Sequence, residues 1–362
     1  MLSFLSDYGL FVAKTLTIVL ALLLLVGGIA LIASRNRRSS APGEISVTSL
    51  NERLEDMQHS LESAIMDKES YKALLKEEHK KEKAEAKARR KALKKKGGSE
   101  EEGEGENEKR RRVFVLDFDG DIRASEVEPL REEISAVLTL ATPEDEVVMR
   151  LESAGGLVHT YGLAASQLER FRAQNIPLTV CVDRVAASGG YMMACLADRL
   201  LAAPFAVLGS IGVVAQMPNF HKLLKKHDID YEVLTAGEFK RTLTMFGENT
   251  DKGREKFIEE LEDTHELFKE FVSSYRPQLD IRKVATGEIW FGKRALEEKL
   301  VDEICTSDDY LMKASKDADV FSVRYEEKKS LQERLSDFAV STGDRLMLRW
   351  WDRLYKSRLL SR

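Results

Sequence analysis

The sequence predicts an α/β fold for the central part of the chain, because strand-like and helix-like segments alternate there. Short apolar runs at 113–118, 147–151 and 178–182 are typical of buried strands. Between them, apolar residues recur at helical spacing over 127–140 and 157–171. This alternation predicts β-α units, with parallel strands joined by right-handed crossovers.

Composition excludes several classes of protein. The chain has 362 residues, more than one typical domain, and a net charge of −5, which gives no bulk attraction to nucleic acid. Its three cysteines, Cys181, Cys195 and Cys305, lack the spacing of metal ligands or of a disulfide framework. We therefore expect no metal, no cofactor and no nucleic-acid partner.

Residues 1–38 are predicted to form a transmembrane anchor. No charged residue occurs from Leu16 to Ala33, and with Leu10 to Ala13 added the segment can span the ~30 Å of a bilayer core. No Ala-x-Ala site follows, so cleavage as a signal peptide is disfavoured. We expect a single-pass protein of the inner (plasma) membrane. The sequence does not determine which face of the membrane carries the rest of the chain.

Residues 39–112 are predicted to form a helical stalk and a charged linker. An apolar heptad pattern runs through Leu50, Leu54, Met57, Leu61 and Ala64, and continues at Tyr71 and Leu75. Such a helix either pairs with copies of itself or is a lone amphipathic helix. The charge-dense stretch 80–112 is predicted to be a solvated tether.

Residues 113–325 are predicted to form the globular domain. Beyond the first units we expect short strands at 200–207, 211–214 and 231–235 and a long amphipathic helix at 250–275. Residues 326–362 are basic and aromatic, and as a helix they fit either a membrane interface or a neighbouring subunit.

Ser188 is the first candidate site residue. It lies in Ala187-Ser188-Gly189-Gly190, between the apolar run 178–182 and a stretch of small apolar residues with helical spacing. A serine at such a strand-to-helix turn either caps the helix or acts as a nucleophile with a nearby backbone N–H as an oxyanion donor.

Two further stretches favour chemistry over capping. Gly155 and Gly156 follow the strand-like run 147–151, and their lack of side chains lets the backbone approach a ligand. Lys240 follows the strand-like run 231–235 and is expected on a loop.

Together these stretches resemble the signal peptide peptidase A / protease IV family, most closely its SohB branch. The motifs are Ser-Ala-Gly-Gly (153–156), Ala-Ala-Ser-Gly-Gly-Tyr (186–191), Gly-Ser-Ile-Gly-Val (209–213) and Ala-Gly-Glu-Phe-Lys (236–240). The resemblance implies a crotonase/ClpP-like fold, a homo-oligomeric ring and a Ser-Lys dyad. It implies Ser188 as nucleophile, Lys240 as general base, Ser210 as the hydroxyl that orients the lysine, and Gly156 and Gly189 as backbone oxyanion donors. Ala154 departs from the proline that many relatives carry there.

A lysine works as a base only when it is unprotonated, and burial away from carboxylates favours that form. We expect Phe239, Leu243, Met245 and Phe246 to cover Lys240, and Glu238 to point away from it. His159 is the alternative base, although its place after the glycine pair favours a surface position.

Together these expectations predict a membrane-anchored serine endopeptidase that cleaves extended peptides. Signal peptides and membrane-protein fragments are its candidate substrates. A crotonase-like acyl-CoA enzyme, which would not need Ser188, and a non-catalytic membrane scaffold are the alternatives.

Overall fold

The computed structural model describes residues 9–12, 14–18, 21, 43–77, 80, 83, 87 and 110–326. The chain divides into two units, one of residues 45–325 and one of residues 1–44 with 326–362. In the second unit, residues 9–12 and 14–18 are helical. Over the described ranges, no helix is both long and apolar enough to cross a bilayer. Most of the predicted anchor, Leu16 to Ala33, and nearly all of the predicted segment 326–362 lie outside those ranges.

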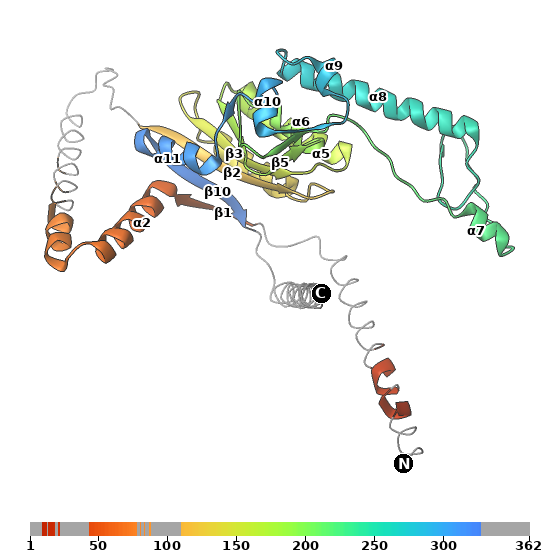
Figure 1. Ribbon diagram of the computed structural model, residues 1–362, viewed down its shortest axis with the longest axis horizontal. Coiled ribbons are helices and arrows are strands. Elements are labelled where there is room, and N and C mark those ends of the chain that lie inside the picture. The colour runs from red at the N-terminus through yellow and green to blue at the C-terminus, as the bar shows by residue number, and fades with distance from the viewer. Residues whose placement is uncertain are drawn as a thin grey trace, which may run out of the picture. The chain divides into compact units, whose positions relative to one another are not determined.

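A ten-stranded sheet forms the centre of the larger unit, as Figure 1 shows. Its main path runs β1-β10-β2-β3-β4-β6-β9. The bounds are β1 Glu44–Ser49, β2 Arg111–Gly120, β3 Glu146–Ser153, β4 Leu178–Val182, β6 Arg199–Ala202, β9 Glu303–Ile304 and β10 Ala318–Glu326. From β10 to β9 the neighbouring strands are parallel, as the alternating elements predicted.

Three short strands branch from this path beside the candidate site. They are β5 Val185–Ala187, β7 Val207–Gly209 and β8 Ile289–Phe291. β5 pairs with the last residue of β3, at Ser153, and also with β7. β8 pairs with β7 in the antiparallel direction. The carboxyl ends of β3, β5 and β7 therefore come together.

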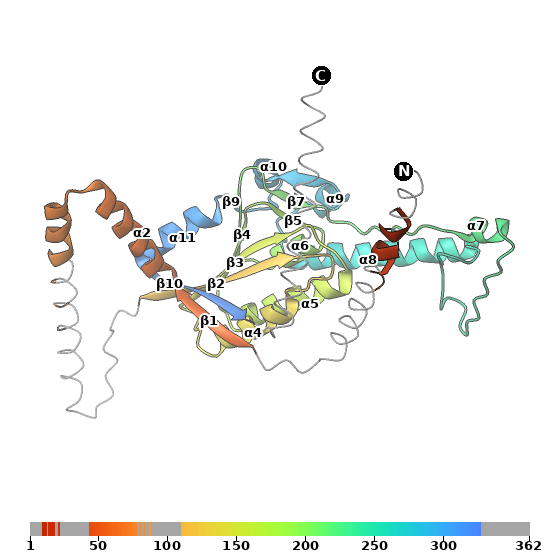
Figure 2. The same cartoon turned by 90° about the horizontal axis from the view of Figure 1, so that it is seen from below.

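Helices cover both faces of the sheet (Figures 1 and 2). One face packs against α4 Val127–Leu138, α5 Val158–Ala173 and α6 Gly189–Ala194 in the larger apolar core, which takes Leu116 and Phe118 from β2. The other face packs against α11 Ser307–Asp317 in a smaller core, which takes Val113 and Val115 from the same strand. This division follows from the two-residue repeat of a strand.

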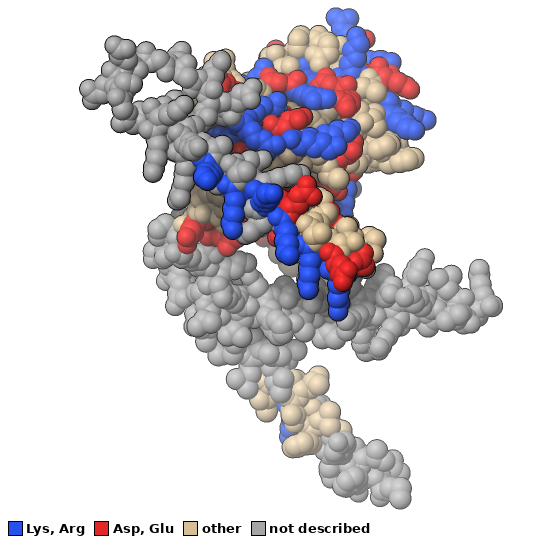
Figure 3. Space-filling model, turned by 90° about the vertical axis from the view of Figure 1, so that its left-hand side faces the viewer, with Lys and Arg blue, Asp and Glu red and all other residues tan. Residues whose placement is uncertain are grey.

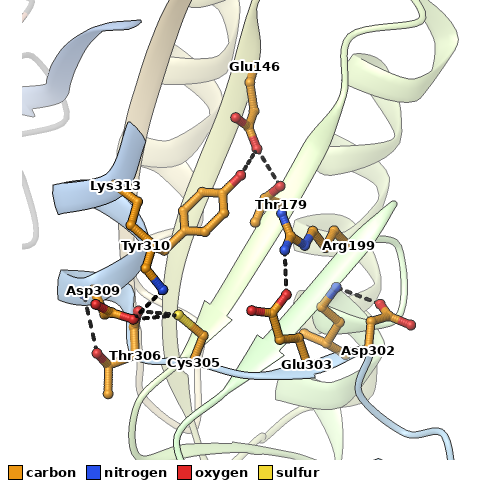
Figure 4. Close-up of polar contacts among 11 residues, drawn as sticks. Glu146, Thr179, Arg199, Asp302, Glu303, Cys305, Thr306, Asp309, Tyr310 and Lys313 are labelled. Carbon is orange, nitrogen blue, oxygen red and sulfur yellow. Dashed lines mark hydrogen bonds and ion pairs between the residues drawn. The ribbon is translucent and has the colours of Figure 1, made fainter. Parts of the chain in front are cut away.

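A buried polar cluster holds α11 against the second face (Figure 4). The carboxylate of Glu146 accepts hydrogen bonds from Thr179 Oγ1 at 2.5 Å and from the hydroxyl of Tyr310 at 2.6 Å. Glu146 is the first residue of β3, so this cluster lies at the amino ends of the parallel strands. The carboxyl ends of β3 and β5 lie on the opposite side of the sheet. Two ion pairs, Arg199–Glu303 and Lys313–Asp309, lie near this cluster (Figure 4). Charges of both signs also lie side by side on the face of the molecule that Figure 3 shows.

The helix α8, Asp251–Tyr275, confirms the long amphipathic helix predicted at 250–275. The side chain of Thr250 caps it by accepting the N–H of Gly253 at 3.1 Å. Only Phe268 and Val272 of α8 are buried, so its first half projects from the sheet (Figures 1 and 2). The short helix α7, His221–Lys226, and the chain that joins it to α8 lie at this projecting end. The remaining helices are α2 Leu50–Ile65, α9 Ile281–Val284 and α10 Gly292–Glu297.

The domain begins earlier than its predicted start at Val113. β1 joins the sheet beside β10, and Asn51 at the start of α2 bonds to Ser315, Ala318 and Val320. The predicted stalk 39–112 therefore includes one strand of the fold. α2 ends at Ile65 and residues 68–77 form a separate helical stretch, so Tyr71 and Leu75 do not continue α2 as the heptad pattern suggested.

Two predicted strands, 211–214 and 231–235, are not strands in the structure. Both segments have β-branched and apolar residues, but no neighbouring strand of the described chain pairs with them. A strand needs a partner for its backbone groups, and local sequence does not reveal whether one is available.

Candidate active site

Ser188 lies at the predicted turn, between the last residue of β5 and the first residue of α6. Its backbone angles are φ +52° and ψ −118°, a conformation that costs a non-glycine residue of order 1–3 kcal/mol. Two hydrogen bonds hold it there. The N–H of Ser188 donates to the carbonyl of Gly209 at 2.8 Å, and the carbonyl of Ser188 accepts the N–H of Met192 at 3.0 Å.

The side chain of Ser188 is left open. The residue is half-buried, and Ser188 Oγ makes no hydrogen bond within the described part of the chain. In particular, Oγ does not cap α6, which was the structural alternative to a nucleophile. Ser188 thus lies on a strained turn from strand to helix and its hydroxyl is open. This is the geometry of the turn known as a nucleophile elbow.

The turn that contains Gly155 and Gly156 packs directly against this elbow. Gly155 has φ +88°, and a Cβ atom added there would lie 2.7 Å from the amide nitrogen of Gly189 and 2.8 Å from the Cβ atom of Ser188. A Cβ atom at Gly156 would lie 2.1 Å from the carbonyl oxygen of Ile122. Only glycine permits these approaches.

Backbone N–H groups remain unpaired around Ser188. Over residues 43–77 and 110–326, the N–H groups of Gly156 and Gly189 donate to no acceptor. Gly156 is exposed, so its N–H is open to solvent or to a ligand, whereas Gly189 is buried at the start of α6, where helix N–H groups have no intrahelical partner.

Ser210 lies beside the elbow, directly after β7, the strand that pairs with β5. Ala187 is paired with Gly209, so Ser188 and Ser210 follow paired positions of β5 and β7. Ser210 also has a positive φ, +51°, and its N–H donates to the carbonyl of Glu288 at 2.7 Å. The structure therefore brings Ser188, Ser210, Gly156 and Gly189 to one edge of the sheet.

Lys240 is the predicted site residue that the structure does not bring to the others. It is exposed and makes no hydrogen bond to Ser188 or Ser210 within the described chain. Its segment lies at the start of α8, where Lys252 pairs with Glu238 and lies over the ring of Phe239. Glu238 thus bonds to a lysine other than Lys240.

The length of α8 indicates how far this segment lies from the elbow. His265 Nε2 lies 3.3 Å from the carbonyl oxygen of Ile211, the residue after Ser210. Gly253, where an added Cβ atom would lie 2.4 Å from the carbonyl oxygen of Thr242, is twelve residues earlier in the helix. At 1.5 Å per residue this separation is roughly 18 Å. The apolar cover expected over Lys240 is also not formed, since Phe239, Met245 and Phe246 are themselves exposed.

The histidines add one unexpected neighbour. His159, the alternative base, is exposed in the first turn of α5. His265 had no signal in the sequence, because its contact with Ile211 joins residues 54 positions apart. Over the described ranges, no group of three His, Cys, Asp or Glu side chains is arranged to hold a metal ion.

Comparison with known proteins identifies the family. Models of the peptidase family S49 N-terminal region and of peptidase family S49 match residues 3–168 and 170–321. The probable protease SohB of Haemophilus influenzae is 52% identical over 346 residues, which cover 96% of each chain. The chain belongs to peptidase family S49.

Other relatives fix its branch within S49. A probable protease SohB of Buchnera aphidicola (Acyrthosiphon pisum) is 58% identical over 62% of this chain and 67% of its own. Protease 4 of Haemophilus influenzae is 28% identical over 46% of this chain and 28% of its own. The similarity therefore places the chain in the SohB branch of S49, and it is a protease. The mixed α/β sheet described above fits this family.

Proposed function

We propose that this S49 protease is a membrane-anchored serine endopeptidase with a crotonase/ClpP-like catalytic domain, in which Ser188 is the nucleophile and Lys240 the general base. The observation that carries the proposal is the Ser188 elbow. Its open hydroxyl lies at a strained turn, beside two glycine N–H groups that have no partner in the described chain. The nucleophile and its oxyanion donors are thus preorganised in the way acyl transfer requires.

The reaction follows from these positions. The Lys240 amine removes the proton of Ser188 Oγ as the oxygen attacks the carbonyl carbon of the scissile peptide bond. The N–H groups of Gly156 and Gly189 donate to the resulting oxyanion. The Lys240 ammonium then protonates the leaving amine, and water hydrolyses the ester on Ser188 to regenerate the hydroxyl.

The lysine reaches this site from a second copy of the chain. Lys240 lies on a projecting segment that is unsuited to isolation in water, since Leu234 is 92% exposed and Val233, Phe239 and Phe246 are also exposed. The strand-like run 231–235 has no strand partner in its own chain. Docking on a neighbour would cover these groups and give the run a partner. Burial there would disfavour the charged ammonium, and Ser210, next to Ser188 on the paired strand, would orient the amine. A head-to-tail contact of this kind forms a ring when the rotation between copies closes on itself.

Substrate and location follow from the chemistry and the sequence. An extended peptide can pair its backbone with a strand edge, which leaves its side chains to fill pockets on either side. The uncharged run from Leu16 to Ala33 would hold the domain at the inner membrane, where signal peptides and membrane-protein fragments are candidate substrates.

Labelling with a fluorophosphonate probe tests this proposal. The full-length protein in membranes should be labelled, Ser188→Ala should not be, and Lys240→Met should be labelled much more slowly. Labelling of Ser188→Ala would overturn the assignment of the nucleophile. Acyl-CoA turnover that survives Ser188→Ala would instead support a crotonase-like enzyme, and a wild-type protein that takes no label would support a scaffold.

A further inference from the structure

A pair of buried hydroxyl groups lies directly beneath the glycine turn. Ser153 ends β3 and is 2% exposed, and Tyr161 of α5 is fully buried. Ser153 Oγ lies 2.5 Å from the hydroxyl oxygen of Tyr161. The Gly155 N–H donates to Ser153 Oγ at 3.0 Å, and the Tyr161 hydroxyl donates to the carbonyl of Asp121 at 2.7 Å. A continuous chain of hydrogen bonds therefore joins the glycine turn to the loop after β2.

The directions of the two end bonds of this chain are fixed. The Gly155 N–H can only donate and the Asp121 carbonyl can only accept. Ser153 Oγ also donates to the carbonyl of Gly120 at 3.2 Å, so either hydroxyl can supply the proton that lies between Ser153 and Tyr161. Removing either hydroxyl therefore breaks the chain at two bonds.

This chain determines which backbone donor of the turn stays free. Ser153 Oγ holds the N–H of Gly155, and the carbonyl of Ile122, next to Asp121, holds the N–H of Leu157 at 2.9 Å. The Gly156 N–H lies between these two fixed neighbours, and no acceptor in the described chain takes it. Its direction is thus set by partners on both sides.

Tyr161 also touches the second donor. A Cβ atom added to Gly189 would lie 2.4 Å from Cγ of the Tyr161 ring, so the ring packs against the Gly189 backbone. A Cβ atom added to Gly190 would lie 2.5 Å from the carbonyl oxygen of Ser153. The Ser153–Tyr161 pair therefore supports both the glycine turn and the start of α6.

We propose that Ser153 and Tyr161 are positioning residues that aim the N–H groups of Gly156 and Gly189 at the oxyanion. The inference rests on the proposed function, because it assumes that acyl transfer takes place at Ser188. Neither side chain touches the substrate. Their effect is exerted in the transition state, when the carbonyl oxygen moves into line with both donors.

The test compares Ser153→Ala and Tyr161→Phe with a matched control, Tyr191→Phe. Tyr191 is also fully buried, and its hydroxyl donates to the carbonyl of Leu300 at 2.9 Å, away from the glycine turn. The measurements are the maximal rate of fluorophosphonate labelling, the probe concentration at half that rate, and the melting temperature of the full-length protein. The phosphonyl oxygen of the probe occupies the place of the oxyanion.

We expect Ser153→Ala and Tyr161→Phe to lower the maximal labelling rate by about 10- to 100-fold, with the half-saturating concentration changed less than about 3-fold. Tyr191→Phe should lower the melting temperature comparably but leave the labelling rate near wild type. The double variant should be hardly slower than either single variant, because both break one chain.

The outcomes separate this inference from the proposed function. Wild-type labelling rates in Ser153→Ala and Tyr161→Phe, with Ser188→Ala unlabelled, would overturn the positioning role alone. An equal rate loss in Tyr191→Phe would also overturn it, because the effect would then be one of stability. Labelling of Ser188→Ala would overturn the proposed function itself.

Discussion

The backbone of Gly155 lies so close to Ser188 that a Cβ atom on Gly155 would be 2.8 Å from the Cβ atom of Ser188. Atoms of this type do not approach so closely in folded proteins, and Gly155 also has φ +88°. The turn that carries Ser188 and the turn that carries Gly155 and Gly156 are thus in direct backbone contact. A change in one turn must move the other.

Gly155→Ala tests this contact. The substitution should lower the free energy of unfolding by about 1–3 kcal/mol, since alanine is strained at positive φ, and it should slow fluorophosphonate labelling at least about 10-fold. Gly162→Ala is the matched control, because a Cβ atom there would meet nothing within 4 Å. It lies within α5 and should raise stability by up to about 1 kcal/mol without slowing labelling. Equal labelling rates in the two variants would refute the contact as a constraint on the site.

The buried carboxyl of Glu133 should make the stability of the domain depend on pH. Glu133 is 5% exposed, its Oε1 accepts the N–H of Tyr325 at 2.8 Å, and its Oε2 has no partner in the described chain. Burial raises the pKa of Glu133 from 4.5 to about 7. Because the folded state holds this proton more tightly, the free energy of unfolding should fall as pH rises from about 4.5 to 7, by up to about 3 kcal/mol.

Glu133→Gln should remove that slope, as measured by denaturant unfolding between pH 5 and pH 8. Asp145 provides the opposite control. Burial alone would raise the pKa of Asp145. Hydrogen bonds from Arg112 and Thr142 outweigh this effect and lower the pKa of Asp145 to about 2. Its contribution is present above pH 3.8 and is lost as pH falls toward 2, so Asp145→Asn should lower stability at neutral pH but leave the slope between pH 5 and pH 8 unchanged. An unchanged slope in Glu133→Gln would contradict the pKa assigned to Glu133.

Asn51 should contribute to the stability of the domain although its hydrogen-bond partners lie 264 to 269 positions later in the chain. Its amide donates to the carbonyls of Ser315 and Ala318 at 2.9 and 3.0 Å and accepts the N–H of Val320 at 2.7 Å. Asn51→Ala should lower the free energy of unfolding by about 2 kcal/mol. Gln58→Ala, which removes an exposed bond to Glu62, should change it by less than about 0.5 kcal/mol. A loss at Asn51 no larger than that at Gln58 would argue that β1 and α2 do not belong to the folded domain.

The choice of base can be tested at His159 and Lys240. We expect His159→Ala to retain most peptidase activity, because His159 is exposed in α5 and lies outside the Ser188 contacts. Lys240→Met and Lys240→Arg should both be inactive, since an arginine stays protonated and cannot serve as a base. Cleavage of a fluorogenic peptide library by purified full-length variants gives the comparison. Loss of activity in His159→Ala with activity retained in Lys240→Met would reverse the assignment.

Local sequence predicted those parts of the fold that local sequence determines. Apolar periodicity located β2, β3, β4 and α8, and the small residues around Ser188 located the turn between β5 and α6. It failed where pairing is decided by distant residues. β1 finds its partner about 270 residues later, at β10, and the run 231–235 finds none.

The arrangement of the candidate site was predictable only where neighbouring residues in the sequence determine it. The glycine motifs pointed to Gly156 and Gly189, but the Ser153–Tyr161 hydrogen bond joins a strand end to a helix and has no signature in spacing. The distance of Lys240 from Ser188 was also hidden, because it follows from how far α8 projects beyond its last core contacts. A motif fixes which residues occur, whereas the tertiary fold decides which of them meet.

Co-expression of Ser188→Ala with Lys240→Met, in the full-length chain, tests most directly whether the two residues form one site across copies. Each variant alone should be inactive. In mixed oligomers, about a quarter of the contacts join an intact Ser188 to an intact Lys240 from different copies, so about a quarter of the wild-type peptidase activity should return. Mixed oligomers, verified by native mass spectrometry, that remain inactive would contradict a shared site.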